Sequence, residues 1–204
     1  NPTDADIIFK SGSGSTRTDP MKTIFYTGEN SRPDFLHCRY ALSFDRDDWS
    51  GRNLYFPNWM GRLNWPNYKR TKNSTHPAHH WENLIDPAVL TTPRPLTSEL
   101  YDKQFCAIVA YAYEGLRVSL TAGLNDYRKV NARGRLFGNP LNQSKHDFFR
   151  SYKFVLCPEN SFFPGYVTEK LFDAWVGGAV PLYFGGSGAD STINSKAFVN
   201  YANF

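Results

Sequence analysis

The sequence has 204 residues, which is enough for one large domain or two small ones. Hydrophobic residues make up 41% and charged residues 21%, as in soluble globular proteins, and the Lys and Arg residues behind the net charge of +4 are scattered, which argues against nucleic-acid binding. No apolar run reaches the roughly 18 residues of a membrane span, and no secretory signal pattern opens the sequence.

The first part of the sequence alternates short strand-like runs with turns. The runs cover residues 5–9, 23–27, 40–44 and 53–57. Residues 59–80 are rich in Trp, Asn, Pro and His without a clear period, which predicts a long loop of the kind that is often functional. The Pro-rich residues 91–98 predict a linker.

After this linker the pattern becomes strand-helix-strand-helix-strand. We expect strands at residues 105–110, 153–157 and 179–184, and helices at residues 116–127, at a stretch closed by Phe148 and Phe149, and at residues 167–176. Strands that alternate with helices predict a parallel sheet with helices on both faces. Such sheets bind their ligands at the carboxyl ends of the strands.

The cysteines indicate no disulfide framework and no zinc site. Cys38, Cys106 and Cys157 are odd in number and widely spaced, and two of them lie within apolar strand-like runs. We expect three buried free thiols.

One segment carries most of the functional information. It reads YKFVLCPENS over residues 152–161 and YVTEK over residues 166–170, which predicts a strand, a polar loop with Glu159, and a helix start. A helix N-terminus attracts anions, and Lys170 in the first turn would be unfavourable unless an anion binds beside it. The alternative is a capped surface helix on which Glu169 and Lys170 form a neighbouring pair of charges.

These motifs, with GAVP at residues 178–181, resemble the donor-binding signature of the α1,3-fucosyltransferase family, glycosyltransferase family 10. The resemblance implies an α/β fold of the GT-B type, with two Rossmann-like domains facing a cleft, and GDP-fucose as the donor substrate. Residues 1–98 would form the acceptor-side domain and residues 99–204 the donor-binding domain. The family has more chain at both ends, so we expect an internal fragment in which both domains are incomplete.

A second resemblance lies in FYTGENS at residues 25–31, which is similar to the segment that bears the catalytic carboxylate in bacterial members. It implies that Glu29 is the base that removes a proton from the acceptor hydroxyl. Judged from the residues alone, Glu29 follows a strand and a glycine, and a carboxylate on such a turn is usually solvated.

The resemblance also implies a donor site. Asn160, Tyr166 and Glu169 would position the nucleotide and the sugar. Lys170 and Arg135 would neutralise the departing diphosphate, since preorganised cations stabilise a developing negative charge.

Two features of this site stay open. Arg133 is an alternative to Arg135 for the phosphate contact, although Arg135 fits the family pattern better. The family often has Ser-Asn at residues 110–111, where this sequence has Ala-Tyr. Tyr111 or Tyr113 would either stack on the guanine or serve in packing.

We expect no metal and no cofactor. Asp45 and Asp47 match the Asp-x-Asp motif of metal-dependent transferases, but they lie in the acceptor half, where we expect a solvated turn. The histidines at positions 76, 79 and 80 have no acidic partner nearby in the sequence and suggest a loop that contacts the acceptor.

We therefore predict an inverting glycosyltransferase that moves fucose from GDP-fucose to a hydroxyl of GlcNAc or glucose in an acceptor glycan. Its partners would be a nucleotide-sugar donor and a glycan, not nucleic acid, with peripheral or tethered membrane association outside this segment. A bacterial protein would be cytoplasmic or membrane-associated, and a eukaryotic one would lie in the Golgi membrane. The rivals are a GT-B transferase for another nucleotide sugar and an inactive fragment that only binds glycan.

Overall fold

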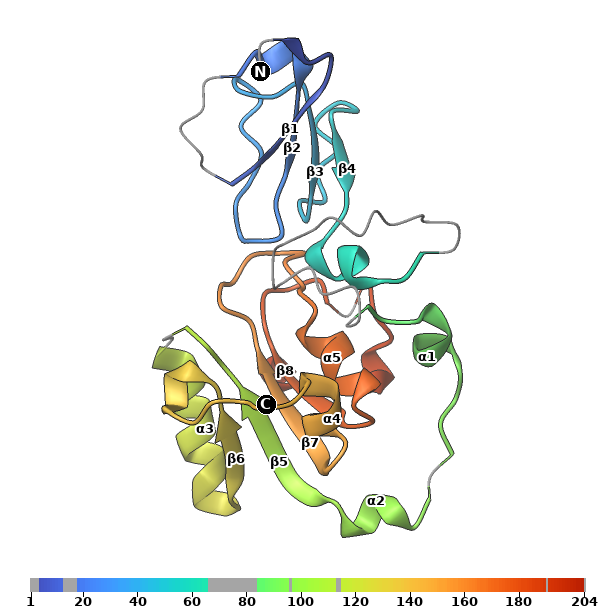
Figure 1. Cartoon of the computed structure of the whole chain (residues 1–204), viewed down its shortest axis with the longest axis vertical. Helices are drawn as coiled ribbons and strands as arrows, with labels where there is room; N and C mark the ends of the chain where they lie inside the picture. Colours follow the sequence, from blue (N-terminus) through green and yellow to red (C-terminus); the bar gives the residue numbers. More distant parts are fainter. Residues whose placement is uncertain are drawn as a thin grey trace. The chain divides into compact units, whose positions relative to one another are not determined.

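A computed structural model describes residues 4–12, 18–65, 84–95, 97–112, 115–189 and 191–203. The chain folds into two compact units. Unit 1 comprises Asn1–Gly61, Ser161–Thr168 and Gly185–Thr192, and unit 2 comprises Arg62–Asn160, Glu169–Phe184 and Ile193–Phe204. Each unit contains one parallel sheet (Figure 1). Each of these compact units combines residues from both halves of the chain. The domain boundary after residue 98 stays a prediction.

The sheet of unit 1 has four short parallel strands in sequence order. They are β1 Ile8–Ser11, β2 Thr23–Tyr26, β3 Tyr40–Ser43 and β4 Asn53–Tyr55. Phe25, Cys38 and Ala41 form a buried cluster on which Phe35 packs. Two short 3-10 helices, Pro20–Lys22 and Asn58–Arg62, flank the strands. The four predicted runs are confirmed as strands, although β1 begins at Ile8 rather than at residue 5.

The sheet of unit 2 has the strand order β6-β5-β7-β8-β9, and all of its pairings are parallel. The strands are β5 Gln104–Val109, β6 Val130–Arg133, β7 Tyr152–Pro158, β8 Val180–Phe184 and β9 Val199–Asn200. The expected parallel sheet is confirmed. Because all the strands run the same way, their carboxyl ends lie along one edge.

Helices cover both faces of this sheet, as predicted (Figure 1). Leu120 and Leu124 of α3 Gly115–Tyr127 pack on a buried cluster formed by Cys106, Ile108, Val130 and Leu156. The thiol of the next residue, Cys157, donates to the carbonyl of Lys170 in α5 Lys170–Val176 at 3.4 Å. Since neighbouring strand residues point to opposite faces, α3 and α5 lie on opposite faces.

The other helices of the described residues are short. They are α1 Pro87–Thr91, α2 Glu99–Asp102, α4 Lys145–Phe149 and three 3-10 helices at Arg135–Phe137, Ser195–Ala197 and Tyr201–Asn203. The predicted linker falls between α1 and α2, and its described residues form no helix or strand beyond the last residue of α1. Among the described helices, none is long and apolar enough to cross a membrane.

The helix predicted over residues 167–176 begins later than expected. α5 starts at Lys170, whereas Val167 belongs to a buried loop of unit 1. In that loop the amide of Tyr166 donates to the carbonyl of Phe163 at 3.0 Å, which forms a turn. The apolar spacing of Val167 reflects burial in this loop and not a helical stripe.

The three cysteines are buried and free, as predicted. Burial raises the pKa of Cys106 to about 12 and also raises the pKa values of Cys38 and Cys157. These thiols are therefore packing residues of the two units and not nucleophiles.

Candidate active site

Glu29 lies in a well-defined turn that follows β2. Its amide donates to the hydroxyl of Thr27 at 3.1 Å, and the side chain of Asn58 donates to the carbonyl of Gly28 at 3.1 Å. Glycine leaves room for the side chain of Asn58, since a Cβ at position 28 would lie 2.4 Å from its amide nitrogen and would force that side chain to shift. The carboxylate of Glu29 is exposed, as expected for a turn, and it accepts a hydrogen bond from the hydroxyl of Tyr166 at 3.3 Å.

Tyr166 reaches Glu29 from the second half of the sequence, since residues 161–168 belong to unit 1. The tyrosine is buried, and its ring packs edge-on against Phe44 with centroids 5.1 Å apart. The side chain of Asn30 donates to the hydroxyl of Ser161 at 2.5 Å. Two contacts therefore join the turn that carries Glu29 to the loop that carries Tyr166.

In unit 2, Lys170 is paired with an acidic residue of the chain itself. Its ammonium lies 2.7 Å from the carboxylate of Glu159, whose side chain is 0% exposed. Glu159 is the first residue after β7. Its amide donates at 2.8 Å to the carbonyl of Phe184, the last residue of β8. Glu159 thus compensates the charge of Lys170 within the chain and fixes the ammonium at the carboxyl edge of the sheet, whereas a bound anion beside Lys170 stays a prediction.

A second ion cluster holds the first turn of α5. The carboxylate of Asp173 lies 2.8 Å from His146 and 3.3 Å from Lys145, and the ammonium of Lys145 also lies 3.9 Å from Glu169. Burial favours a higher pKa for Asp173, but hydrogen bonding to His146 and the charge of Lys145 outweigh it and lower that pKa. The cluster ties α4 to the turn that carries both Glu169 and Lys170.

Arg133 and Arg135 have different environments around Gly134. The guanidinium of Arg133 donates to Asn139 at 2.7 Å, whereas Arg135 is exposed and donates from Nε to the carbonyl of Tyr111 at 3.3 Å. Gly134 has a φ of 101°, and a Cβ there would lie 2.1 Å from the carbonyl oxygen of Ala110. Glycine thus lets the chain turn tightly over β5 and leave Arg135 at the exposed end of β6.

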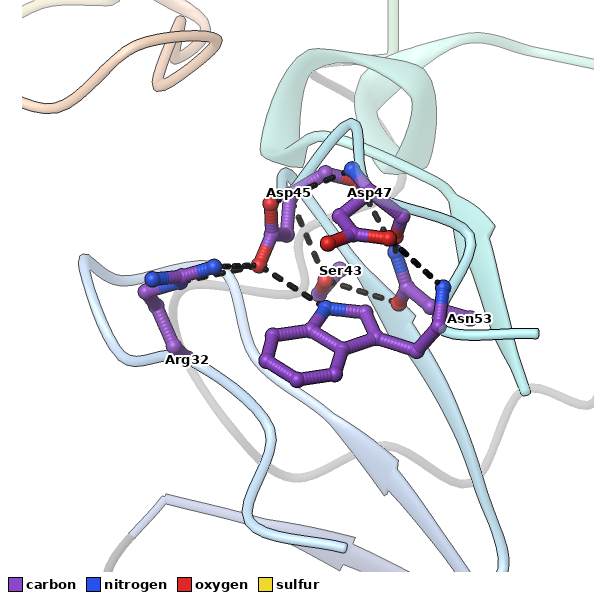
Figure 2. Close-up of polar contacts among 6 residues, drawn as sticks. Arg32, Ser43, Asp45, Asp47 and Asn53 are labelled. Carbon is purple, nitrogen blue, oxygen red and sulfur yellow. Dashed lines mark hydrogen bonds and ion pairs between the residues drawn. The ribbon is translucent and has the colours of Figure 1, made fainter. Parts of the chain in front are cut away.

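The turn that contains Asp45 is not the solvated turn that we predicted. Asp45 is buried, and its carboxylate accepts hydrogen bonds from Arg32 at 2.5 and 2.8 Å and from the indole of Trp49 at 3.2 Å (Figure 2). Asp47 is exposed, in line with the prediction. Burial acts to raise the pKa of Asp45, but the hydrogen bonds from Arg32 and Trp49 outweigh it and lower that pKa.

Hydrogen bonds between side chain and backbone fix this turn further. The hydroxyl of Ser43 donates to Asn53 at 2.8 Å and accepts from the amide of Asp45 at 3.2 Å (Figure 2). Asn53 donates in turn to the carbonyl oxygens of Asp45 and Asp47 at 2.8 and 3.0 Å. The formal Asp-x-Asp motif therefore serves to organise Arg32 and the β3–β4 connection. Within the described part of the chain, no three His, Cys, Asp or Glu residues are grouped as metal ligands.

The predicted site residues fall into two groups. Glu29 and Tyr166 meet in unit 1, whereas Arg135, Asn160, Glu169 and Lys170 follow the ends of β6 and β7 in unit 2. The sequence pattern did not identify Arg32 as the partner of Asp45. It also placed Glu159 in a polar loop after its strand, although Glu159 is buried. Tyr113 and the predicted histidine loop lie outside the described residues.

The comparisons with known proteins agree with this geometry. Residues 101–204 match the family model "Glycosyltransferase family 10 (fucosyltransferase) C-term", and residues 2–61 match "Alpha-(1,3)-fucosyltransferase FucT N-terminal domain". The alpha-(1,3)-fucosyltransferase FucT of Helicobacter pylori is 31% identical over 228 residues, which covers 100% of this chain and 47% of the relative. The chain thus spans about half the length of that relative.

Two further similarities are informative. The 4-galactosyl-N-acetylglucosaminide 3-alpha-L-fucosyltransferase 9 of Rattus norvegicus is 28% identical over 120 residues, which covers 57% of this chain and 33% of the relative. A crystal structure of an alpha1,3-fucosyltransferase with GDP-fucose is similar with a TM-score of 0.74 and 27% identity, over 100% of this chain and 63% of that chain. This likeness confirms the predicted α/β fold of the GT-B type. The chain belongs to glycosyltransferase family 10.

Proposed function

We propose that this chain takes part in the transfer of fucose from GDP-fucose to a hydroxyl of a GlcNAc or glucose residue in an acceptor glycan. The observation that carries the proposal is the hydrogen bond between Glu29 and Tyr166. It brings the carboxylate of the FYTGENS motif into contact with Tyr166, the first residue of the YVTEK motif. The similarity to an alpha-(1,3)-fucosyltransferase and to the crystal structure of an alpha1,3-fucosyltransferase with GDP-fucose supports the choice of donor.

The proposed reaction is a single inverting displacement. The acceptor oxygen forms a bond to C1 of fucose while the bond from C1 to the phosphate oxygen of GDP breaks. Glu29 takes the proton from the acceptor hydroxyl, and the hydroxyl of Tyr166 orients the carboxylate of Glu29. The transition state has oxocarbenium character, as in glycoside hydrolysis.

The departing diphosphate needs compensating positive charge. Arg135 and Lys170 would supply it, and Asn160 and Glu169 would position the nucleotide. The support is that Arg135 is exposed at the end of β6 and that Glu159 holds the ammonium of Lys170. A preorganised cation requires little reorganisation when the leaving group develops its charge.

We further propose that transfer needs no metal ion. Asp45, the first residue of the formal metal motif, already accepts hydrogen bonds from Arg32 and Trp49. Activity should therefore survive chelation with EDTA. Complete loss in EDTA that a divalent cation restores would overturn this part of the proposal.

The decisive experiment measures release of GDP from GDP-fucose by the full-length protein with a panel of neutral acceptors. GDP-mannose and UDP-sugars serve as competing donors in the same assay. We expect GDP release that depends on GDP-fucose and on an acceptor with a terminal or internal GlcNAc or glucose. Turnover of another donor would favour a different sugar-nucleotide specificity, and glycan binding without any turnover would favour an inactive binding protein.

A further inference from the structure

We propose that the side chains of Arg32, Trp49 and Phe163 form a binding platform for a neutral pyranose ring of the acceptor glycan. We call these three side chains the Arg32 platform. The proposal rests on the proposed function, because it assigns the acceptor side of that reaction to particular residues.

The platform is built around one guanidinium group. The Cζ atom of Arg32 lies over the ring of Trp49 at 5.5 Å and over the ring of Phe163 at 4.9 Å from the ring centroid. Nε and Nη2 of Arg32 both donate to Asp45, which fixes the plane of the guanidinium (Figure 2). Cation–π contact with two rings and a charge-assisted pair together leave Arg32 little rotational freedom.

One donor of this guanidinium remains available to a ligand. The side chain of Arg32 is 43% exposed while that of Asp45 is 7% exposed, so the pair opens to solvent on the arginine side. Among the described residues, Nη1 of Arg32 has no hydrogen-bond partner. Because Asp45 neutralises the charge of Arg32, this donor favours a sugar hydroxyl over an anion.

Trp49 is held in a conformation that bulky residues avoid. Its φ is 51°, and that of Ser50 is 58°. Hydrogen bonds from the amide of Trp49 to Asp47 at 2.9 Å and from the amide of Ser50 to Asp48 at 3.0 Å maintain this turn. The strained turn leaves Trp49 38% exposed beside Arg32, and strained backbone at an exposed aromatic residue points to a binding role.

The chemistry of such a surface suits a sugar ring. The axial C–H groups of a pyranose pack on an aromatic face, while its hydroxyls accept hydrogen bonds from a fixed guanidinium. Arg32 follows Glu29 by three residues, and Phe163 precedes Tyr166, the partner of Glu29, by three residues. All of them belong to unit 1, so the platform accompanies the proposed base.

The test uses steady-state kinetics of the full-length protein with a 4-galactosyl-N-acetylglucosaminide as acceptor. Arg32→Lys keeps a positive charge beside Asp45 but removes the planar group and Nη1. Trp49→Asn removes the ring and keeps a residue that tolerates positive φ. For each variant we expect the acceptor KM to rise about 10–100-fold, while the KM for GDP-fucose changes less than about twofold.

Arg39→Ala is the matched control, because Arg39 is an exposed arginine that stacks on Tyr40 in the same unit, with Cζ 5.3 Å from the ring. It should leave the acceptor KM unchanged. An acceptor KM within twofold of the wild type for both platform variants would overturn the platform alone, since turnover would persist. A parallel rise of both KM values would also overturn it, because general distortion would then explain the loss.

A second measurement does not depend on these variants. The protein has five tryptophans, and labelling with 5-fluorotryptophan gives each of them a ¹⁹F resonance. The resonance that disappears in the Trp49→Phe variant belongs to Trp49. The Trp49 resonance should shift on titration with the acceptor. An unchanged resonance at saturating acceptor would contradict the proposal. If no acceptor supports GDP release from GDP-fucose, the proposed function fails and the platform fails with it.

Discussion

The hydroxyl of Tyr166 donates a hydrogen bond to the carboxylate of Glu29, although the two residues lie 137 positions apart in the sequence. A motif that reads as part of a nucleotide site thus supplies a partner to the residue proposed as the base.

Glu29→Gln should lower kcat by about 100–10,000-fold, because the amide keeps the shape of the carboxylate but cannot take a proton. The affinity for GDP-fucose, measured by calorimetry, should stay within about threefold, since the proposed donor residues other than Tyr166 lie in unit 2. Asp6→Asn is the control, as it neutralises another exposed carboxylate of unit 1. Near wild-type turnover of Glu29→Gln would show that another group is the base.

Tyr166→Phe should lower kcat about 10-fold, because it removes a hydrogen bond to a charged group. If Tyr166 acts through Glu29, the substitution should cause almost no further loss in the Glu29→Gln background. An equal loss in both backgrounds would instead assign Tyr166 to the donor. Tyr127→Phe, at an exposed ring on α3, is the control for loss of a tyrosine hydroxyl.

Lys170→Ala should weaken GDP binding about 30–150-fold and also destabilise the protein by about 3 kcal/mol, because it leaves the carboxylate of Glu159 buried without its cation. The double variant Lys170→Ala with Glu159→Gln should recover much of the stability but none of the GDP affinity. Urea unfolding and calorimetry measure the two effects separately. Unchanged GDP affinity in a folded Lys170→Ala protein would remove Lys170 from the donor site.

Asp173→Asn should destabilise the protein by about 3 kcal/mol at pH 7, because it leaves Lys145 and His146 without their buried anion. The folded protein lowers the pKa of Asp173 below its unfolded value of about 3.9. The stability from this carboxylate is therefore present above pH 4 and is lost as the pH falls through the lowered pKa. The difference in free energy of unfolding between Asp173→Asn and the wild type, measured by urea unfolding, should become smaller as the pH falls below 4.

The control for this pH series is Asp147→Asn, which removes an exposed carboxylate of α4 that lies 3.5 Å from Arg150. It should change the free energy of unfolding by less than about 1 kcal/mol at pH 7. If the difference in free energy of unfolding between Asp173→Asn and the wild type stayed constant from pH 7 to pH 3.5, the charged carboxylate of Asp173 would not be the source of this stability.

Much of the fold could be predicted because short apolar runs and their punctuation are local signals. Residues 23–27 and 40–44 read as strands, and they pair in parallel as β2 and β3. The alternation of strands and helices after residue 104 likewise predicted a parallel sheet with helices on both faces, and α3 and α5 do lie on opposite faces. Local apolar runs were sufficient for these elements, because a buried strand of a parallel sheet is a short continuous apolar run and a helix shows an apolar stripe.

The ion pairs of the site could not be predicted in the same way. The burial of Asp45 depends on Arg32, which lies 13 residues upstream, and nothing in the acidic turn itself indicates that partner. The same holds for Glu159 and Lys170, which are 11 residues apart and meet only when β7 and α5 are in place. A charged residue is exposed or buried according to its tertiary partner, which a local pattern does not contain.

Unit 1 joins the start of the chain to loops near its end, and this connectivity has a consequence for biosynthesis. Arg46 hydrogen-bonds to the carbonyl of Gly188, 142 residues later, at 3.0 Å. Tyr166 lies 137 residues after Glu29. At a synthesis rate of about 5–20 residues per second, the turn that carries Glu29 therefore waits roughly 7–27 seconds for this partner. Contacts between distant residues also slow folding. The nascent first sheet should therefore stay accessible to chaperones and proteases during this interval, and the contact between Glu29 and Tyr166 can form only after Tyr166 has left the ribosome.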